Sequence, residues 1–580
     1  MKIPMTTKRI RFAFILLILT ALVPLRVAYL QPPTAPQAEI DRRKLEELED
    51  KSEDVANGLL ELAVALRNGE TGKVAAYFAD PAQTTPLPTA PTTATPQVKW
   101  VQQHGWNFEP KKAVVTTRTA LANQWDRLLD NFSEVEDIRF KLRASSFDET
   151  GRVMNATVAF WLVGRNAQGH RAWLRATAET VLNFDTTDKL TGGIPNSLSH
   201  EKGRWLIREF AIQPINSLIA TQDLFSEVSA PAGVAERLPA YGETGNTGFV
   251  WRGAAAGDFN RDGWMDLIVT GATRNYLYLN DRQGKFRDAS DEVGIRLFES
   301  GAGPLVLDYD NDGDTDIFMA NVGQQLLFEN RLVPDGKLTF NDVSLQAGVA
   351  VDGFGFSAAT ADVNGDGWLD VYVASYNRYG QVIPDSWFRA TNGTPNLLFI
   401  NQRDGTFSEA ARKWGLDDRR WSYAATFADI NGDHRPDLFV ANDFGEKGMF
   451  VNRGDHFTDE AAARGLLDLG NGMGVMFGDY NNDGRLDIHA TNMSSTAGNR
   501  IVSRLFPNQG AQQNVYKKLA SGNNLFENLG DGKFKDVTAA IGGLSGMWAW
   551  GGGFIDIDGD GWEDIFTPNG FISGKSMADT

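Results

Sequence analysis

The chain has 580 residues, of which 42% are hydrophobic and 22% are charged, and its formal net charge is -18 at pH 7. This length predicts more than one domain, and the 15 Trp and 35 Phe residues argue against a disordered chain. The acidic balance argues against a nucleic-acid partner. The absence of cysteine excludes disulfides, thiolate catalysis and cysteine-ligated zinc.

Residues 1–30 predict an export signal. A basic stretch with Lys8, Arg9 and Arg11 precedes an apolar run at 12–25, the order that a signal peptide has. The run is short for a membrane span, Arg26 interrupts it, and no small-residue cleavage site follows. It is therefore a cleaved signal peptide or an uncleaved membrane anchor, and a buried N-terminal helix is the other alternative. We expect an exported protein, periplasmic, cell-surface or secreted, that meets a membrane only through this segment.

Residues 31–38 are proline-rich and predict a linker, and residues 39–215 predict a small α+β domain. Apolar residues at helical spacing predict two helices, at 38–68 and 113–132. Alternating apolar and polar residues then predict about four antiparallel strands between 138 and 212. The Thr/Pro-rich stretch at 80–97 is expected to be a loop without regular structure.

This order of helices and strands resembles the cone-like fold of the SnoaL-like, nuclear-transport-factor-2-like superfamily. Such domains include enzymes and inert dimerisation modules, so the resemblance alone implies no activity. The sequence of this domain shows no convincing acid–base pair.

Residues 220–572 consist of repeats in which three motifs recur, and residues 573–580 form a tail. The first motif is a nine-residue acidic loop with Asp, Asx, Asp and Asp at positions 1, 3, 5 and 9. The second is F-x-[DE]-x(5)-G, which starts at 225, 286, 340, 407, 457 and 534. The third, typified by L-F-x-N, precedes the second motif in five copies. The acidic loops, numbered 1 to 6, are 258–266, 308–316, 362–370, 429–437, 479–487 and 556–564.

The acidic loops predict calcium sites. Positions 1, 3, 5 and 9 supply only side-chain oxygens and position 7 supplies its carbonyl oxygen, a donor set that suits a hard cation of high coordination number. Magnesium prefers a stricter octahedron, and zinc prefers His or Cys. An EF-hand requires Glu at position 12, followed by a helix, whereas here β-rich segments begin at position 9. The candidate metal ligands are Asp258, Asn260, Asp262, Trp264 and Asp266; Asp308, Asp310, Asp312, Asp314 and Asp316; Asp362, Asn364, Asp366, Trp368 and Asp370; Asp429, Asn431, Asp433, Arg435 and Asp437; Asp479, Asn481, Asp483, Arg485 and Asp487; and Asp556, Asp558, Asp560, Trp562 and Asp564.

Two positions within these loops carry more specific expectations. Position 6 is Gly in five of six loops, as a tight turn with positive φ requires, and His434 replaces it in loop 4. We therefore expect up to six bound Ca²⁺ ions, with the site at 429–437 the weaker one. In loop 2, Asp314 is expected to lend only its backbone carbonyl, with its carboxylate facing solvent.

The repeats resemble FG-GAP/VCBS repeats, the calcium-loop blades of the integrin α-subunit propeller. With the second and third motifs, they are similar to the cartilage-acidic-protein-like family, whose members often carry an ASPIC/UnbV module. The resemblance covers about residues 225–570 and implies calcium ligation by the loop residues. It implies a mainly β fold: an integrin-type propeller of about six to seven four-stranded blades, after the α+β domain and the N-terminal hydrophobic segment. Since loop 6 is not followed by the other motifs, the last blade is either completed from elsewhere in the chain or truncated, and we expect truncation.

Two long inserts, at 375–395 and 493–523, are the candidate binding surfaces. In the first, Tyr376, Tyr379, Trp387 and Phe388 are suited to stack on a sugar or to anchor a protein, or alternatively to pack on the neighbouring blade. The sequence contains no catalytic constellation. We therefore expect a binding, adhesion or scaffolding module, stabilised by calcium, with a protein or glycan ligand. The alternative is an extracytoplasmic enzyme acting on polysaccharide or a small molecule, with the propeller as its accessory binding domain.

Overall fold

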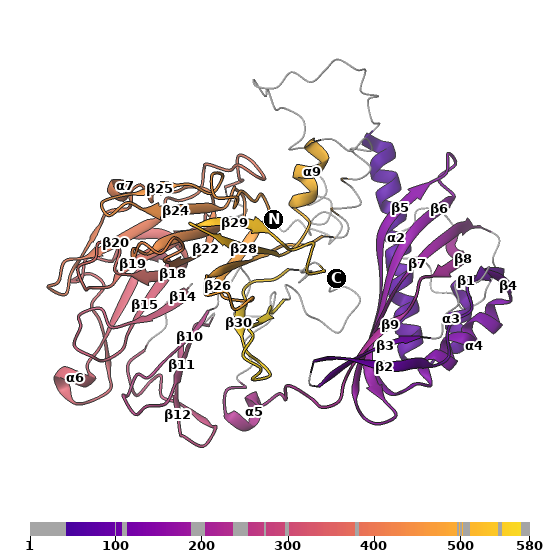
Figure 1. The fold of residues 1–580 in the computed structure, drawn as a ribbon, viewed down its shortest axis with the longest axis horizontal. Coiled ribbons are helices and arrows are strands. Elements are labelled where there is room, and N and C mark those ends of the chain that lie inside the picture. Colours follow the sequence, from indigo (N-terminus) through magenta and orange to yellow (C-terminus); the bar gives the residue numbers. More distant parts are fainter. Residues whose placement is uncertain are drawn as a thin grey trace, which may run out of the picture. The chain divides into compact units, whose positions relative to one another are not determined.

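The computed structural model describes a mainly β chain, as predicted (Figure 1). The segments expected to be the signal or anchor (1–30), the linker (31–38) and the tail (573–580) lie outside the described residues. Among the helices that the structure describes, none combines the length and the apolar character needed to cross a membrane. The described residues are 42–98, 100–106, 113–186, 203–235, 253–271, 274–295, 301–377, 382–495, 498, 502, 511–542 and 548–569.

The α+β region is one strongly connected sheet with helices against it. Strand β7 pairs with β6, β8 and β9, so the sheet continues in two directions from one long strand. Further strands extend the sheet in the order β2-β3-β9-β7-β8-β1-β4. The elements are α2 (Arg42–Arg67), α3 (Thr71–Ala76), β1 (Phe78–Thr84), β2 (Pro91–Val98), β3 (Val101–Trp106), β4 (Val114–Thr116), α4 (Arg118–Leu129), β5 (Phe132–Phe147), β6 (Val153–Asn166), β7 (Arg171–Asp185), β8 (Arg204–Ile212) and β9 (Asn216–Ala220).

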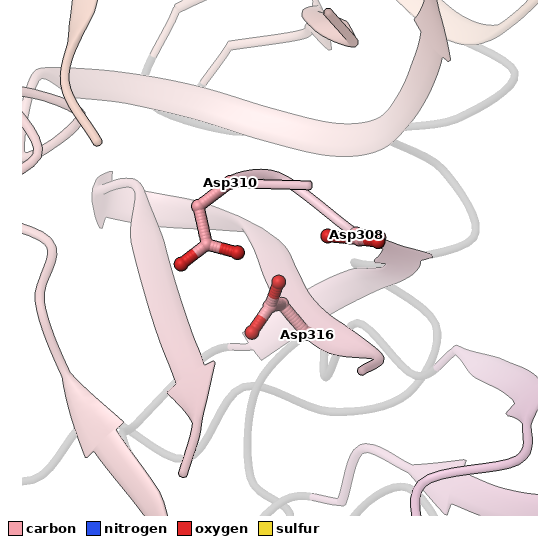
Figure 2. Close-up of side chains that lie close together, drawn as sticks. All are labelled: Asp308, Asp310 and Asp316. Carbon is pink, nitrogen blue, oxygen red and sulfur yellow. The ribbon is translucent and has the colours of Figure 1, made fainter. Parts of the chain in front are cut away.

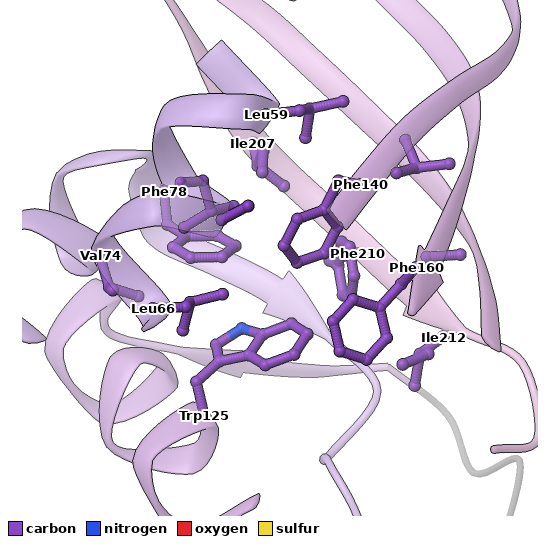
Figure 3. Packing of buried hydrophobic residues seen from close by; sticks show 14 of the residues in the cluster. Leu59, Leu66, Val74, Phe78, Trp125, Phe140, Phe160, Ile207, Phe210 and Ile212 are labelled. Atoms are coloured by element: carbon purple, nitrogen blue, oxygen red, sulfur yellow. The ribbon is translucent and has the colours of Figure 1, made fainter. Parts of the chain in front are cut away.

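The core of this region lies between the helices and one face of the sheet (Figure 3). Alternate residues of β6 are buried, which is the period expected of a strand with one face on a core. Trp125 of α4 is fully buried, and its ring lies 5.7 Å from Phe140, 5.2 Å from Phe160 and 5.9 Å from Phe210 in edge-on contacts. Such contacts add to the stabilisation from burial alone.

The expectation of an irregular loop at 80–97 is wrong, because β1 and β2 occupy most of it. Thr favours strands, since its branched side chain packs well on a pleated surface. Pro91 begins β2, which is an edge strand, where proline is tolerated. Thr84 is buried and donates a hydrogen bond to the carbonyl oxygen of Phe210.

The repeat region contains five four-stranded antiparallel units and one hairpin among its described residues. In Figure 1 these units run from magenta to yellow. Two of these units form one continuous sheet, because the end of β15 (Asp316–Gln324) pairs with β18 (Asp352–Ala361). Blade 1 is β10 (Ala254–Gly257), β11 (Asp266–Val269), β12 (Tyr276–Asn280) and β13 (Phe286–Asp288); blade 2 is β14 (Gly301–Leu307), β15 (Asp316–Gln324), β16 (Leu326–Asn330) and β17 (Phe340–Asp342); blade 3 is β18 (Asp352–Ala361), β19 (Asp370–Ser375), β20 (Leu397–Asn401) and β21 (Phe407–Glu409); blade 4 is β22 (Ser422–Ala428), β23 (Asp437–Asn442), β24 (Gly448–Asn452) and β25 (Phe457–Asp459); blade 5 is β26 (Gly472–Gly478), β27 (Asp487–Asn492), β28 (Asn524–Gly530) and β29 (Lys533–Asp536); and the hairpin is β30 (Gly553–Ile555) with β31 (Asp564–Phe566).

These units are arranged as propeller blades. The first strands of successive units are neighbours: β10 and β14, β14 and β18, β18 and β22, β22 and β26, and β26 and β30. The second strands β19, β23 and β27 are buried along their whole length, because a blade packs against another blade on each face. The short helix α5 (Ser229–Ala232) precedes the first blade, α6 (Leu332–Asp335) and α7 (Ala411–Trp414) follow blade strands, and α9 (Ala511–Lys518) lies in the second insert.

The glycine of the second motif is a contact point between successive repeats. It has positive φ in all six copies, from 74° at Gly415 to 93° at Gly542. A Cβ at Gly465 would lie 2.3 Å from the carbonyl oxygen of Phe534, the phenylalanine that opens the next copy of the motif. The N–H of Phe534 donates to the carbonyl oxygen of Arg464, next to that glycine. Glycine is therefore required twice, for its backbone conformation and for this close approach.

Gly465→Ala should destabilise the chain more than Gly454→Ala. Both glycines have positive φ, 79° and 93°, so each alanine costs about 1–2 kcal/mol in backbone strain. Only at Gly465 must the Phe534 carbonyl also move, since no atom lies within 4 Å of a Cβ at Gly454. Differential scanning calorimetry of the two variants measures the difference. Equal losses in Tm would show that the inter-blade contact adds nothing.

Candidate metal centre

Each acidic loop is the turn of a β-hairpin. In all six loops the residue before position 1 pairs with the aspartate at position 9, as Leu307 pairs with Asp316 and Ala361 with Asp370. Position 9 is therefore the first residue of a strand, which confirms that these loops are not EF-hands. The same hairpin brings the first and last proposed ligands of a loop together.

Carboxylates inside the loop hold its backbone. In loop 3, Asp362 accepts hydrogen bonds from the N–H groups of Asp366 at 2.9 Å and Gly367 at 2.7 Å, and Asp366 accepts one from Trp368 at 3.0 Å. Loops 1, 4, 5 and 6 repeat this pattern. The side chains at positions 1 and 5 thus hold the backbone of these loops in a tight turn.

Two positions of each loop have positive φ. Position 6 was expected, and it includes His434 at 63°. Position 4 was missed, although Gly or Asn occupies it in five loops, and both residues tolerate this conformation. The position-4 residues are Arg261, Asn311, Gly365, Gly432, Asn482 and Gly559.

Three carboxylates converge in loop 2 and in loop 6. In loop 2, oxygens of Asp308, Asp310 and Asp316 lie within 4.8 Å of one another, and the three side chains point toward a common centre (Figure 2). Oδ1 of Asp308 is buried and accepts no hydrogen bond from the described residues. Asp556, Asp558 and Asp564 form the same group in loop 6. In the other four loops position 3 is Asn, which supplies an oxygen without a charge.

The aspartates at position 9 of loops 1 to 5 are almost completely buried, with at most 1% of each exposed. Burial is the main cause that raises the pKa of Asp316 to about 9 and that of Asp370 to about 7. It also raises the pKa of Asp437 and Asp487 to about 6. The neighbouring carboxylates raise these pKa values further, so a cation among them would offset both effects.

Arginine side chains contact the position-5 aspartates of four loops. Arg282 pairs with Asp262, Arg403 with Asp366, and the position-7 arginines Arg435 and Arg485 pair with the position-5 aspartates of their own loops. No described arginine forms an ion pair with position 5 of loop 2 or loop 6. Those two loops therefore combine Asp at position 3 with a position-5 aspartate that has no ion pair to a described arginine.

The expectation that the Asp314 carboxylate faces solvent is wrong. Only 1% of Asp314 is exposed, and its Oδ2 accepts a hydrogen bond of 2.8 Å from the N–H of Val333. Val333 belongs to α6, the short helix that lengthens this repeat and covers the loop. Burial raises the pKa of Asp314 to about 6.

The first insert packs largely on the neighbouring blade. Tyr376 is 5% exposed, and its hydroxyl donates to the carboxylate of Asp443 in the turn after β23. The Trp387 ring lies 5.3 Å from that of Phe444. Tyr376 is therefore not available to stack on a ligand, which corrects that part of the expectation, and Tyr379 lies outside the described residues.

The described parts of the two inserts also meet each other. The ring of Phe388 in the first insert lies 6.2 Å from that of Tyr516, in α9 of the second insert. Ile383 is 60% exposed, and Arg389 pairs with Glu446 at the surface. The first insert thus contacts the second through Phe388 and Tyr516, and it carries Ile383 and Arg389 as exposed side chains.

The FG-GAP-like repeat family matches residues 258–319, 308–373, 383–440, 429–490 and 516–567, ranges that include all six acidic loops. Among known proteins, cartilage acidic protein 1 of Homo sapiens is 28% identical over 256 residues, covering 41% of this chain and 38% of that protein. The Mus musculus protein is 27% identical over the same length, covering 41% and 39%. The match thus spans about two fifths of these relatives.

Two solved structures align with 55% of this chain at 18% identity. One shows recognition of non-reducing terminal N-acetylglucosamine by an Agrocybe aegerita lectin, with a TM-score of 0.32 over 74% of that chain. The other is the V. cholerae biofilm matrix protein Bap1, with a TM-score of 0.22 over 42%. At these TM-scores neither structure bears on the fold or ligand of this chain. The repeat matches confirm the FG-GAP-like repeats that the sequence predicts, and over about two fifths of its length the chain is similar to cartilage acidic protein 1.

Proposed function

We propose that this chain is an exported, calcium-stabilised β-propeller that acts as a binding or adhesion module for a protein or glycan partner. The observation that carries the calcium part is the convergence of Asp308, Asp310 and Asp316 in loop 2, with a buried carboxylate oxygen that accepts no hydrogen bond from the described residues. The residues fit a hard cation because all their donors are oxygens. The export part rests on the sequence pattern at 1–30.

In this proposal the protein residues at positions 1, 3, 5, 7 and 9 of each loop hold the ion. A bound Ca²⁺ supplies positive charge where buried carboxylates otherwise repel each other. It ties the first strand of a blade to the second, because position 9 begins that second strand. In a chain without cysteine, several such ions take the stabilising role that disulfides have in other exported proteins.

The partner-binding part rests on the two inserts at 375–395 and 493–523. Long loops on one side of a rigid repeat scaffold are where binding residues concentrate. Contact between Phe388 and Tyr516 joins the inserts, and Ile383 and Arg389 of the first insert have exposed side chains. An apolar side chain next to an arginine and aromatic rings suits a protein or a glycan partner.

Calcium removal should lower the Tm of the chain. Extracellular modules bind calcium at roughly 10⁻⁴–10⁻³ M, and a tenfold excess over Kd adds about 1.4 kcal/mol per site. Calorimetry with excess chelator, with calcium and with magnesium measures this increment. Asp308→Asn should reduce the increment, whereas Asp352→Asn, which removes the same charge from an exposed strand end, should not. An unchanged Tm in chelator would contradict the calcium proposal.

Replacing His434 should strengthen loop 4. Its backbone has φ of 63° and its side chain is 97% exposed, so His434→Gly relieves strain and loses little packing. We expect a gain of about 1 kcal/mol and a larger calcium-dependent rise in Tm. The reciprocal variant Gly484→His, at φ of 82° in loop 5, should lose stability in the same assay. If both variants shift Tm in one direction, position 6 does not set the strength of the loop.

The partner surface can be tested without disturbing the fold. Ile383→Ser and Arg389→Glu change exposed side chains of the first insert, and Leu345→Ser changes an 83% exposed leucine elsewhere in the propeller. A panel of immobilised polysaccharides and of envelope-fraction proteins, each with and without calcium, serves as the probe. Binding should fall at least tenfold in the double variant and persist in Leu345→Ser, since an interface anchor is worth 1 kcal/mol or more. Retained binding in the double variant would exclude this surface.

A further inference from the structure

The asparagine of the third motif connects two successive acidic loops. The N–H of Asn401 donates to Oδ1 of Asp370, the position-9 aspartate of loop 3, at 2.8 Å. Its Nδ2 group donates to the carbonyl oxygen of Tyr309, at position 2 of loop 2, at 2.7 Å, and to that of Leu369 at 3.3 Å. One side chain that is 2% exposed therefore holds the last residues of one loop and the first residues of the preceding loop.

The connection continues within loop 2. The N–H of Tyr309 donates to Oδ2 of Asp316 at 3.1 Å, and Asp316 is the position-9 aspartate of that loop. Asp316 also accepts the N–H of Asn330 at 2.8 Å, and Nδ2 of Asn330 reaches back to the carbonyl oxygen of Phe259 in loop 1. A proposed ligand in one loop, Asp316, is thus joined to a proposed ligand in the next, Asp370, through the N–H and the carbonyl group of Tyr309 and through Asn401.

The same arrangement recurs along the propeller. Asn452 joins loop 4 to the carbonyl oxygen of Val363 in loop 3, at 2.9 Å, and Asn528 joins loop 5 to that of Ile430 in loop 4, at 3.3 Å. The N–H of each donates to the position-9 aspartate of its own loop. Asn280 of blade 1 makes the bonds to its own loop, but no described loop precedes it.

We propose that Asn330, Asn401, Asn452 and Asn528 are positioning residues that couple successive loops, so that an ion in one loop raises the affinity of the next. The proposal rests on the proposed calcium function and deepens it. An ion at position 9 of a loop orders that aspartate and the asparagine bound to it. The asparagine in turn orders the first residues of the preceding loop. The second ion then binds a loop that is already ordered, so less conformational entropy is lost on binding.

A second link between loops 2 and 3 supports this coupling. Nδ2 of Asn311, at position 4 of loop 2, donates to the carbonyl oxygen of Gly367, at position 6 of loop 3, at 3.3 Å. Asn482 makes the equivalent bond from loop 5 to Gly561 in loop 6, at 2.8 Å. The positive φ at position 4 turns these side chains toward the next loop.

Affinity at loop 3 tests the coupling directly. Tb³⁺ prefers oxygen ligands as Ca²⁺ does, and its luminescence is excited through a nearby tryptophan. Trp264→Phe and Trp562→Phe leave Trp368 as the one tryptophan at position 7 of an acidic loop. In the full chain with these two changes, a Tb³⁺ titration reports loop 3. Competition with Ca²⁺ confirms that the ions share the site.

Disabling loop 2 with Asp308→Asn should lower the affinity of loop 3 by about fivefold or more, the lower range of known couplings between sites. Asp479→Asn disables loop 5, which has no described hydrogen bond to loop 3, and should have a smaller effect. In an Asn401→Ala background, Asp308→Asn should no longer weaken loop 3 to the same degree. If Asn401→Ala does not fold, the isosteric Asn401→Asp, which also lacks the Nδ2 donor, replaces it as the background for Asp308→Asn.

A merely structural asparagine gives a different result. It would lower the Tm in chelator but leave the effect of Asp308→Asn on loop 3 unchanged in the Asn401→Ala background, which overturns the proposal. Equal affinities of loop 3 with and without Asp308→Asn also overturn it. Absence of any Tb³⁺ or Ca²⁺ uptake is a separate outcome, which refutes the calcium function on which the coupling rests.

Discussion

A buried aspartate at the start of the second strand is the constraint on which each blade depends. Its Oδ1 accepts the N–H of the third-strand asparagine in all five complete blades, at 2.7–2.8 Å. In loops 1, 2, 3 and 6 its Oδ2 accepts the N–H of position 2. One carboxylate thus sets the spacing of a loop and two strands. Removing a charged carboxylate from water is costly. The buried aspartate is therefore stable only where these N–H donors, and in our proposal a cation, surround its carboxylate.

Successive blades are held together by hydrogen bonds to backbone groups and by close packing, not by disulfide bonds. The chain has no cysteine, and the contacts that recur between blades are a glycine under the carbonyl of the next phenylalanine and an asparagine bound to the carbonyl of the preceding loop. Both contacts need one particular residue type, because glycine alone leaves room and an asparagine amide donates two hydrogen bonds at once. This explains why three motifs recur together. The glycine of the second motif contacts the phenylalanine of its next copy, and the asparagine of the third motif binds the preceding acidic loop.

Burial decided several assignments that local pattern could not. Tyr376 and Trp387 lie in a long loop with abundant glycine and proline, a context that suggests exposed aromatic rings. They are instead packed against blade 4, because a long loop at the edge of a propeller lies beside its neighbour. Burial also explains Asp314, whose carboxylate was expected to face solvent. It is covered instead by α6, a helix of four residues whose Val333 N–H donates to it, and so short an insertion gives no sequence signal.

Local sequence was enough to predict the repeat, the strand that begins at position 9 of each acidic loop and the positive φ at position 6, because each depends on residues within a few positions of one another. It also indicated the strands of the α+β region through their alternation. Tertiary structure decided which carboxylates are buried, where the Thr/Pro-rich segment forms strands, and how asparagines join one loop to the next. The asparagine links join groups about 70–100 residues apart, such as Asn401 and Tyr309, and no local period predicts which distant carbonyl group a side chain will contact.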